Sequence, residues 1–324
     1  MAAHPSPVPR VRIGSVTRTG ILLMAYGAPE RLDQVEAYYT HIRRGSPPTA
    51  ALLEELVGRY RAIGGGSPLS RIVERQRAAL ALELGRRGHA GAVYAAMKHI
   101  DPFIGDVVRR MAADGIGHLV AIALAPQHSS FNEQTYGRAV EDAAASVAGA
   151  APTVAVVGSW HDRPRLIEAL AAATAEALAR CSHPSGAHVF FTAHSLPERM
   201  AGGSDPYAHE VAATAALVAE RLALQRCDVA FQSAGRTADR WIGPELGAEI
   251  RRVAASGVRE VVVCPVGFVA DHLEVLYDID VEARAIAGGL GLRLERARAL
   301  NDDPLFIAAL ADVAEAAVAR PVAA

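Results

Sequence analysis

The sequence predicts an α/β protein of two lobes, each a four-stranded parallel sheet flanked by helices, around a central cleft. Short apolar runs alternate with longer amphipathic segments along the chain, which is the pattern of strands connected by helices. The runs are nearly uninterrupted, as expected of strands that are buried on both faces. Four such runs fall in each half, and "ILLMAYGAPER" in the first half is echoed by "VFFTAHSLPER" in the second.

The expected strands occupy residues 21–25, 92–97, 118–124, 153–157, 189–193, 228–232, 260–265 and 293–297. Apolar residues with helical spacing predict helices over 49–63, 68–85, 102–114, 135–148, 163–180 and 209–222. The two halves are expected to meet near residues 158–186. We therefore expect a disordered tail over residues 1–19, a first lobe over 20–160 and a second lobe over 161–324, whose last helix is able to pack back on the first lobe.

Composition excludes several classes of protein. At 324 residues and 51% hydrophobic the chain can bury a large core, and no apolar run of about 20 residues indicates a membrane span. A net charge of −2 provides no case for nucleic-acid binding. The first 19 residues lack the apolar segment of a signal peptide, and three cysteines, Cys181, Cys227 and Cys264, do not make a disulfide framework. We expect a cytoplasmic protein.

Polar residues follow the predicted strands directly, where ligands bind in parallel α/β sheets. They are Tyr26, His99, His128, His194 and Asp271. A single histidine at a strand end is most often a hydrogen-bonded structural residue. The Ser-Leu-Pro-Glu that follows His194 looks instead like a shaped loop, and two lobes with facing strand ends imply a cleft.

An acidic row lies in "VGFVADHLEVLYDIDVEAR", residues 266–284. If Asp271 caps a helix, then Glu274, Asp278 and Glu282 lie four residues apart on one face, with Asp271 one turn earlier. A solvated acidic face is the ordinary explanation of such a row. Its apolar neighbours favour a row that leads a hard divalent cation toward a cleft, and one imidazole plus one carboxylate suits transferable Fe(II).

Arginines and hydroxyls form a set of candidate anion ligands. Arg43 and Arg44 lie in "YYTHIRRG", and Arg59, Tyr60 and Ser67 lie in or beside "GRYRAIGGGSPLS"; arginines paired with hydroxyls favour carboxylates. A phosphate-binding loop, a dinucleotide fingerprint, a serine-hydrolase elbow and a zinc motif are all missing. Lys98 is the only lysine among 33 basic residues, either because an ammonium is needed there or by chance.

Together these motifs resemble the ferrochelatases, from residue 21 to about residue 310. The resemblance rests on "LLMAYGAP", "YYTHIRRG", "RYRAIGGGSPLS", "KHIDPFI", "LAPQHSSF", "TAHSLPER", "FQSAGRT…WIGPEL" and "PVGFVADHLEVLYDID". The tyrosine of "MAYG" looks most like the Gram-positive branch that uses coproporphyrin III. The resemblance implies two Rossmann-like domains around a porphyrin cleft, and insertion of Fe(II), a substrate, into coproporphyrin III in heme biosynthesis.

The resemblance also assigns roles to residues. His194 and Glu274 match the metal-handling pair, and Tyr26 matches the residue that approaches iron from the opposite face. Asp278 and Glu282 match an acidic ladder that feeds metal inward. Positions that hold the porphyrin propionates match Arg43, Arg59, Tyr60, Ser67 and Tyr136, and a basic pair near the cleft matches Lys98 and His99.

The chain departs from relatives that carry a [2Fe–2S] cluster on four cysteines. It has three, with none after Cys264, so we expect no cluster. Rival interpretations are a ferrochelatase acting on protoporphyrin IX, a cobalt chelatase, an exported solute binder, and a tetrapyrrole carrier without catalysis. The expected partners are porphyrin and ferrous iron, with transient contact to neighbouring heme-pathway enzymes.

Overall fold

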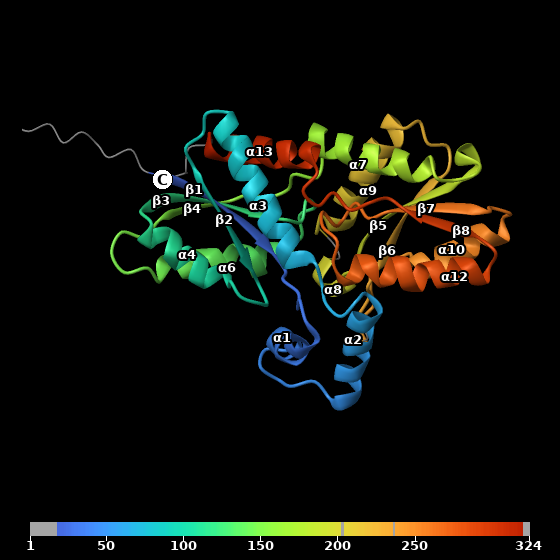
Figure 1. The fold of residues 1–324 in the computed structure, drawn as a ribbon, viewed down its shortest axis with the longest axis horizontal. Coiled ribbons are helices and arrows are strands. Elements are labelled where there is room, and N and C mark those ends of the chain that lie inside the picture. Colours follow the sequence, from blue (N-terminus) through green and yellow to red (C-terminus); the bar gives the residue numbers. More distant parts are fainter. Residues whose placement is uncertain (1–17, 202–203, 236, 320–324) are drawn as a thin grey trace, which may run out of the picture.

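The computed structural model describes residues 18–201, 204–235 and 237–319. Within them the chain forms two four-stranded sheets in which every strand pair is parallel. The first sheet has the order β2-β1-β3-β4 and the second the order β6-β5-β7-β8, so the two lobes repeat one topology. The predicted fold class is confirmed (Figure 1).

The strands fall within three residues of the predicted bounds. They are β1 Arg18–Ala25, β2 Ala92–Met97, β3 Ile116–Ala123, β4 Thr153–Val156, β5 His188–His194, β6 Cys227–Gln232, β7 Glu260–Cys264 and β8 Arg293–Arg296. Residues 18 and 19, expected in the tail, belong instead to β1 because they extend its pairing with β3. The rest of the expected tail lies outside the described residues.

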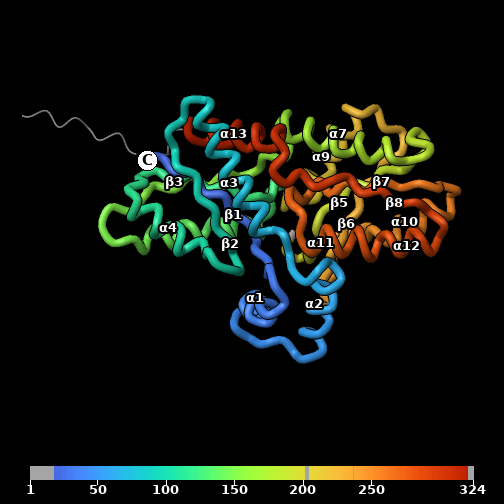
Figure 2. The backbone as a smooth tube through the Cα atoms, viewed as in Figure 1, coloured from blue at the N-terminus to red at the C-terminus, as the bar shows by residue number. Residues whose placement is uncertain are grey.

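Helices cover both faces of each sheet (Figure 1). In the first lobe they are α1 Val35–Ile42, α2 Ala50–Ala62, α3 Leu69–Arg86, α4 Ile104–Ala113, α5 Ser130–Asn132, the π-helix η2 Glu133–Gly137 and α6 Arg138–Ala145. The tube of Figure 2 shows α1 and α2 projecting from the first lobe, away from its sheet. The short 3-10 turns are η1 Leu32–Gln34 and η3 Pro184–Gly186.

The second lobe has the same layering. Its helices are α7 Pro164–Leu178, α8 Glu198–Ala201, α9 Tyr207–Arg221, α10 Leu246–Ala255, α11 Leu273–Leu276, the π-helix η4 Asp278–Ala283, α12 Arg284–Gly289 and α13 Pro304–Val318. Local chemistry sets several starts: Glu245 accepts two backbone N–H groups at the start of α10, and Asp303 does so before the Pro304 that opens α13.

The predicted helix start at Asp271 is wrong. Residue 272 occupies the N-cap of α11 without a side-chain cap, because the Asp271 carboxylate is bound by Arg296 and Asn301 instead. The segment is also not one α-helix. After one turn it widens into the π-helix η4, in which the Glu282 amide donates to the Tyr277 carbonyl.

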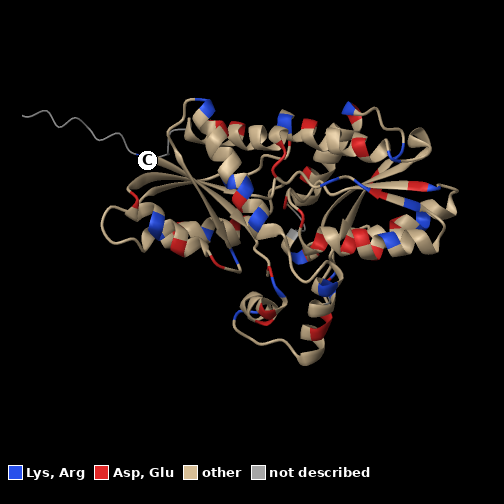
Figure 3. Ribbon diagram, in the orientation of Figure 1, with Lys and Arg blue, Asp and Glu red and all other residues tan. Residues whose placement is uncertain are grey.

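One hydrophobic core crosses both lobes. Leu23 and Ile122 of the first sheet share a cluster with Phe191 of the second and with Phe306 and Leu310 of α13. The last helix therefore packs against α3 and β3 of the first lobe as well as against α7. Charged residues lie mainly on helices and loops around this core (Figure 3).

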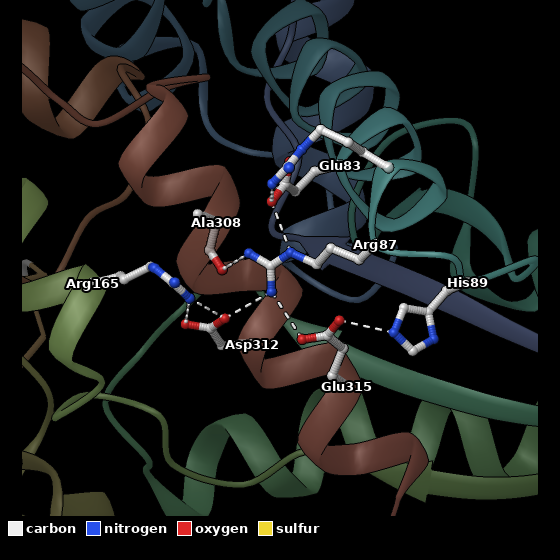
Figure 4. A network of polar contacts seen from close by, with 8 residues as sticks. Glu83, Arg87, His89, Arg165, Ala308, Asp312 and Glu315 are labelled. Carbon is white, nitrogen blue, oxygen red and sulfur yellow. Dashed lines mark hydrogen bonds and ion pairs between the residues drawn. The ribbon is translucent and has the colours of Figure 1, made fainter.

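A cluster of charges fastens α13 to its neighbours (Figure 4). The Arg87 guanidinium, beyond the end of α3, reaches Glu83, Asp312 and Glu315 at 2.7, 2.8 and 2.8 Å. It also donates to the carbonyl of Ala308 on α13. We call this the α13 clasp. It joins the first lobe to the final helix of the chain.

Candidate active site

His194 is the last residue of β5, at the carboxyl end of the second sheet. Its Nδ1–H donates to the carbonyl of Ser195, which leaves Nε2 free to face the Glu274 carboxylate at 3.5 Å. The Tyr207 hydroxyl donates to the backbone carbonyl of His194 at 2.8 Å and holds the strand end in place. The structure thus brings together two residues that lie 80 positions apart in the sequence (274 minus 194).

A second imidazole approaches the same carboxylate, and sequence analysis missed it. His272 has Nδ1 3.0 Å from the Ala270 carbonyl and Nε2 3.4 Å from Glu274 Oε2. Glu274 therefore lies between two imidazoles, each oriented by a backbone carbonyl. The sequence did contain a signal for this residue. His272 lies two residues before Glu274, a candidate metal ligand, in the segment that follows a predicted strand.

Electrostatics make the His194–Glu274 pair ionic. Burial opposes charge on His194, but the nearby Glu274 carboxylate outweighs it and raises the His194 pKa to about 9. Burial would likewise raise the pKa of Glu274, yet the two imidazoles hold it well below its usual range. At neutral pH the ligand-free site therefore holds an imidazolium beside a carboxylate.

Two further acids of the row share one partner. Asp278 is 6% exposed and lies 3.5 Å from Arg59, whose guanidinium also reaches Glu282 at 3.9 Å. Burial raises the Asp278 pKa to about 6, although a hydrogen bond from the Ser233 hydroxyl opposes that shift. Arg59 lies over the Tyr277 ring at 4.9 Å. The arginine expected to bind a propionate is thus paired with the acidic row in this structure.

Asp271 is not brought into that row. Its carboxylate lies 3.1 Å from an Arg296 nitrogen and accepts a 2.8 Å hydrogen bond from the Asn301 amide. Asp278 and Glu282 turn instead toward Arg59. Among the described residues, no group of three or more histidine, cysteine, aspartate and glutamate side chains is arranged to hold a metal ion.

The strand end of the first lobe has different chemistry. Tyr26 follows β1, and its ring packs on the His99 ring with centroids 4.4 Å apart. Lys98 Nζ lies 5.4, 4.8 and 5.5 Å from the rings of Tyr26, Phe131 and Tyr136. Burial and then the Arg44 charge lower the Lys98 pKa to about 8. In the described part of the chain no ion pair joins Lys98 to a carboxylate.

His99 is fixed by a histidine that sequence analysis did not select. Its Nδ1 lies 3.0 Å from Nδ1 of His41 on α1, so one ring donates and the other accepts. Burial, Lys98 and His41 lower the His99 pKa to about 4, and the ring is neutral. Burial raises the Tyr26 pKa, and the charge of Glu274 raises it further. Ala25, beside Tyr26, shares a core cluster with Ala270 of the second lobe, so the end of β1 lies close to the segment that leads to Glu274.

The other candidate anion ligands fall into two groups. Tyr60, Ser67 and Tyr136 are at most 7% exposed, whereas Arg43 is exposed beside the Tyr39 ring. Ser67 Oγ accepts from the amide that begins α3. The preceding glycines are required: a Cβ on Gly66 would lie 2.0 Å from the carbonyl oxygen of residue 30.

His128, the remaining strand-end candidate, points elsewhere. Its Nε2 lies 3.6 Å from the Glu133 carboxylate at the start of η2. Its backbone amide donates to Glu210 of α9, at 2.6 Å, and so joins the lobes. We find no contact between His128 and the strand-end groups in the described residues.

Comparisons with known proteins agree with this architecture. The family model described as Ferrochelatase matches residues 18–318. A coproporphyrin III ferrochelatase of Geobacillus sp. (strain WCH70) is 40% identical over 301 residues, which is 91% of this chain and 96% of that protein. A ferrochelatase of Thermus thermophilus is 44% identical over 317 residues, which is 93% of this chain and 99% of that protein.

Solved structures share the fold. SirB from Bacillus subtilis with Fe³⁺ aligns with a TM-score of 0.57 at 14% identity, over 94% of this chain and 96% of that chain. CbiX, described as the terminal enzyme of siroheme biosynthesis in denitrifying bacteria, aligns with a TM-score of 0.56 at 15% identity, over 92% and 99%. Since the family model spans both lobes and close to all of the described residues, the chain belongs to the ferrochelatase family.

Proposed function

We propose that this protein inserts Fe(II) into coproporphyrin III and so forms Fe-coproporphyrin (coproheme), a step of heme biosynthesis. Relatives named coproporphyrin III ferrochelatase, at 38–40% identity over most of the chain, support this substrate. The observation that carries the proposal is the meeting of two unlike strand ends. The His194–Glu274 pair of one lobe lies near Tyr26 and Lys98 of the other, because Ala25 beside Tyr26 packs with Ala270, shortly before Glu274.

The reaction exchanges two pyrrole N–H protons for one ferrous ion. It therefore needs a metal ligand and a proton acceptor on the porphyrin face, and anchors for the carboxylates at its rim. The second lobe supplies an imidazole and a carboxylate within 3.5 Å of each other. The first lobe supplies a phenol, Tyr26, and the ammonium of Lys98. A clamp between such lobes can also use rim binding to bend the macrocycle.

His194 must change its protonation state during the cycle. In the ligand-free protein its pKa is raised to about 9, so Nε2 carries a proton at neutral pH. A ferrous ion beside the ring disfavours the charged form. The proton then passes to solvent, and the freed Nε2 lone pair can bind iron or accept one of the two pyrrole protons in turn. Glu274 stays anionic and balances the charge.

Two acids of the row are assigned to iron delivery. Asp278 and Glu282 contact one guanidinium, that of Arg59, which offsets part of their negative charge when no metal is present. We assign to them the expected acidic ladder, with Arg59 released when a ferrous ion takes its place. Arg59 could then turn to a propionate. Asp271 is not assigned to the ladder, since its carboxylate is bound elsewhere.

Unpaired cations favour a substrate that is rich in carboxylates. In the described part of the chain, no ion pair joins Arg43, Arg44 or Lys98 to an acid. Coproporphyrin III carries more propionates than protoporphyrin IX, and each can pair with one of these cations. Tyr60, Ser67 and Tyr136 complete the proposed propionate set, with His99 behind Tyr26.

One experiment tests the function and the branch together. The protein is incubated anaerobically with Fe(II) and either coproporphyrin III or protoporphyrin IX, and the absorption spectra are followed. We expect metallation of coproporphyrin III to be the faster reaction. Preference for protoporphyrin IX would move the protein to the other branch, and metallation of neither would refute the chelatase assignment.

Three accessory expectations belong to the same proposal. We expect no [2Fe–2S] cluster, because ligation by thiolates normally needs four cysteines. The three in this chain are spread over the loop after α7 (Cys181), the start of β6 (Cys227) and the end of β7 (Cys264). We also expect a cytoplasmic location and transient contact with neighbouring heme-pathway enzymes. Over the described residues, no helix has both the length and the apolar composition needed to cross a membrane.

A further inference from the structure

A single guanidinium holds the segment that carries Glu274 from both sides. Arg296, the last residue of β8, lies 3.1 Å from the Asp271 carboxylate. Its Nε lies 3.0 Å from both oxygens of Asp280. Asp271 precedes Glu274 and Asp280 follows it, so the two contacts bracket α11 and the start of η4. The Arg296 side chain is 15% exposed, which protects both contacts from solvent.

The two contacts sort the acids of this segment. Residues four apart on a helix are neighbours, while residues two apart point to different sides. With Asp280 drawn to Arg296, Asp278 and Glu282 are left on the side that reaches Arg59. Arg284 strengthens this arrangement because it lies 3.1 Å from Asp280. Arg296 thereby binds Asp271 and Asp280, which fix the segment. It leaves Asp278 and Glu282 for iron.

Asn301 fixes the other end of the same segment. Its side-chain oxygen accepts from the Asp271 amide at 2.9 Å, and its side-chain nitrogen donates to the Asp271 carboxylate at 2.8 Å. The residue has a φ of 47°, which asparagine tolerates better than most residues. Its carbonyl accepts a 2.8 Å hydrogen bond from Gln76 of α3. Asp271 is thus held by the second lobe and, through Asn301, connected to the first.

We propose that Arg296 is a positioning residue for iron insertion, and that Asp271 serves it as a partner and not as a metal ligand. The inference rests on the proposed function, because the group that it positions is the Glu274 carboxylate with its neighbour Asp278. Arginine suits this task because its planar fork binds two carboxylates at fixed angles, which a lysine ammonium does not.

The first test is Arg296→Met, which keeps the length of the side chain and removes its charge. We expect the KM for Fe(II) to rise about 10-fold, as for groups that orient metal ligands, with coproporphyrin III affinity unchanged. Arg296→Lys is expected to fall between this variant and the wild type. The matched control is Arg293→Met, on the same strand, which is 50% exposed and, among the described residues, forms an ion pair only with Glu295. Wild-type KM values in both Arg296 variants would overturn the proposal.

The second test separates positioning from ligation at Asp271. If Asp271 acts through Arg296, then Asp271→Asn is expected to raise the KM for Fe(II) in the wild type and to add little in Arg296→Met. If Asp271 binds iron itself, the two effects multiply, and the proposal fails. The same cycle with Asp280→Asn checks the other contact.

A measurement without turnover keeps the inference distinct from the proposed function. In Arg296→Met, amide hydrogens of residues 274–283 are expected to exchange faster than in the wild type and in Arg293→Met. Unchanged exchange there would overturn the positioning role even if the enzyme is active. If the wild type metallated no porphyrin, the proposed function would fail, while this exchange measurement would still decide whether Arg296 holds the segment.

Discussion

The carboxyl ends of β1 and β5 occupy equivalent places in two sheets of the same strand order, yet their chemistry differs. At the end of β1, Tyr26 packs against a neutral His99 and lies near Lys98, which no carboxylate balances in the described residues. At the end of β5, His194 is held as an imidazolium by Glu274. One end presents a phenol and an unbalanced cation; the other holds an acid and a base together.

This difference shows how a duplicated scaffold divides one reaction. The shared topology brings the two strand ends near each other, and segments that follow neighbouring strands set the charge. In the first lobe the residues directly after β2 supply Lys98 and His99. In the second lobe α11, which follows β7, supplies Glu274. A porphyrin bound between them would have cations for its carboxylates on one side and proton acceptors on the other.

The largest expected effect comes from removing the imidazole of the second lobe. His194→Ala is expected to lower kcat for iron insertion by about 10²- to 10⁴-fold, the range for loss of a positioned acid–base group. Coproporphyrin III affinity should stay within a few-fold, because the anchors belong to the first lobe. His183→Ala, which removes an imidazole that is 88% exposed, serves as the control. Turnover near the wild-type rate would show that His194 is not required for iron insertion, and the proposed division of roles between the two strand ends would be wrong.

The next effect concerns the α13 clasp, one of the contacts that hold the lobes together. Arg87→Met removes the centre of the α13 clasp and leaves three carboxylates without their shared cation. We expect a loss of about 2 kcal/mol in the free energy of unfolding, below the cost of breaking a fully buried pair. Urea denaturation measures it. Arg86, whose side chain is 73% exposed, pairs only with Glu83 within the described part of the chain, so Arg86→Met should change stability by less than about 0.5 kcal/mol.

A smaller effect is expected at the cation of the first lobe. Lys98→Met keeps the apolar stem among the three rings and removes the ammonium. Coproporphyrin III should bind about 10-fold more weakly, equivalent to about 1.4 kcal/mol, with kcat little changed. Fluorescence titration measures the affinity, and Arg110→Met on the exposed face of α4 is the control. Equal affinities would show that Lys98 does not contact the substrate.

The smallest effect is a displaced titration. In the ligand-free protein the His194 imidazole is expected to titrate near pH 9 by NMR, well above the ordinary value of about 6.5. Because the folded pKa is raised, the contribution of its charge to stability is complete below about pH 6.5 and is lost as the pH rises through about 9. Glu274→Gln removes the main cause, so the midpoint should fall. An unchanged midpoint would contradict the ion pair.

Much of the fold could be predicted because buried parallel strands leave a local signal. The run Val-Phe-Phe-Thr-Ala before His194 and the run before Tyr26 are apolar because these strands are buried. The burial affects consecutive residues, so a short stretch of sequence is enough to predict the strand. Helix 135–148 was predicted as one element, but it begins as the π-helix η2, since backbone widening leaves no trace in apolar spacing.

Less of the site than of the fold could be predicted from short stretches of sequence. His194 and Glu274 meet only through the packing of β5 beside β7, and family resemblance, not spacing, indicated the pair. The expected helix cap at Asp271 was wrong because the partners of this carboxylate, Arg296 and Asn301, lie 25 and 30 positions away (296 minus 271, 301 minus 271). His272 went unnoticed because the pattern that was sought repeats every four residues, and a residue two positions from Glu274 falls outside it.

The helix that completes the first lobe, α13, follows all the strands of the second lobe in the chain. Leu23 and Ile122 share their core cluster with Phe306 and Leu310 of α13, so the first sheet keeps an uncovered apolar face while the second lobe is still on the ribosome. At synthesis rates of about 5–20 residues per second, the interval from residue 123 to residue 318 lasts roughly 10–40 s. Early termination before α13 would therefore release an aggregation-prone chain, although every residue proposed to act on iron would already be present.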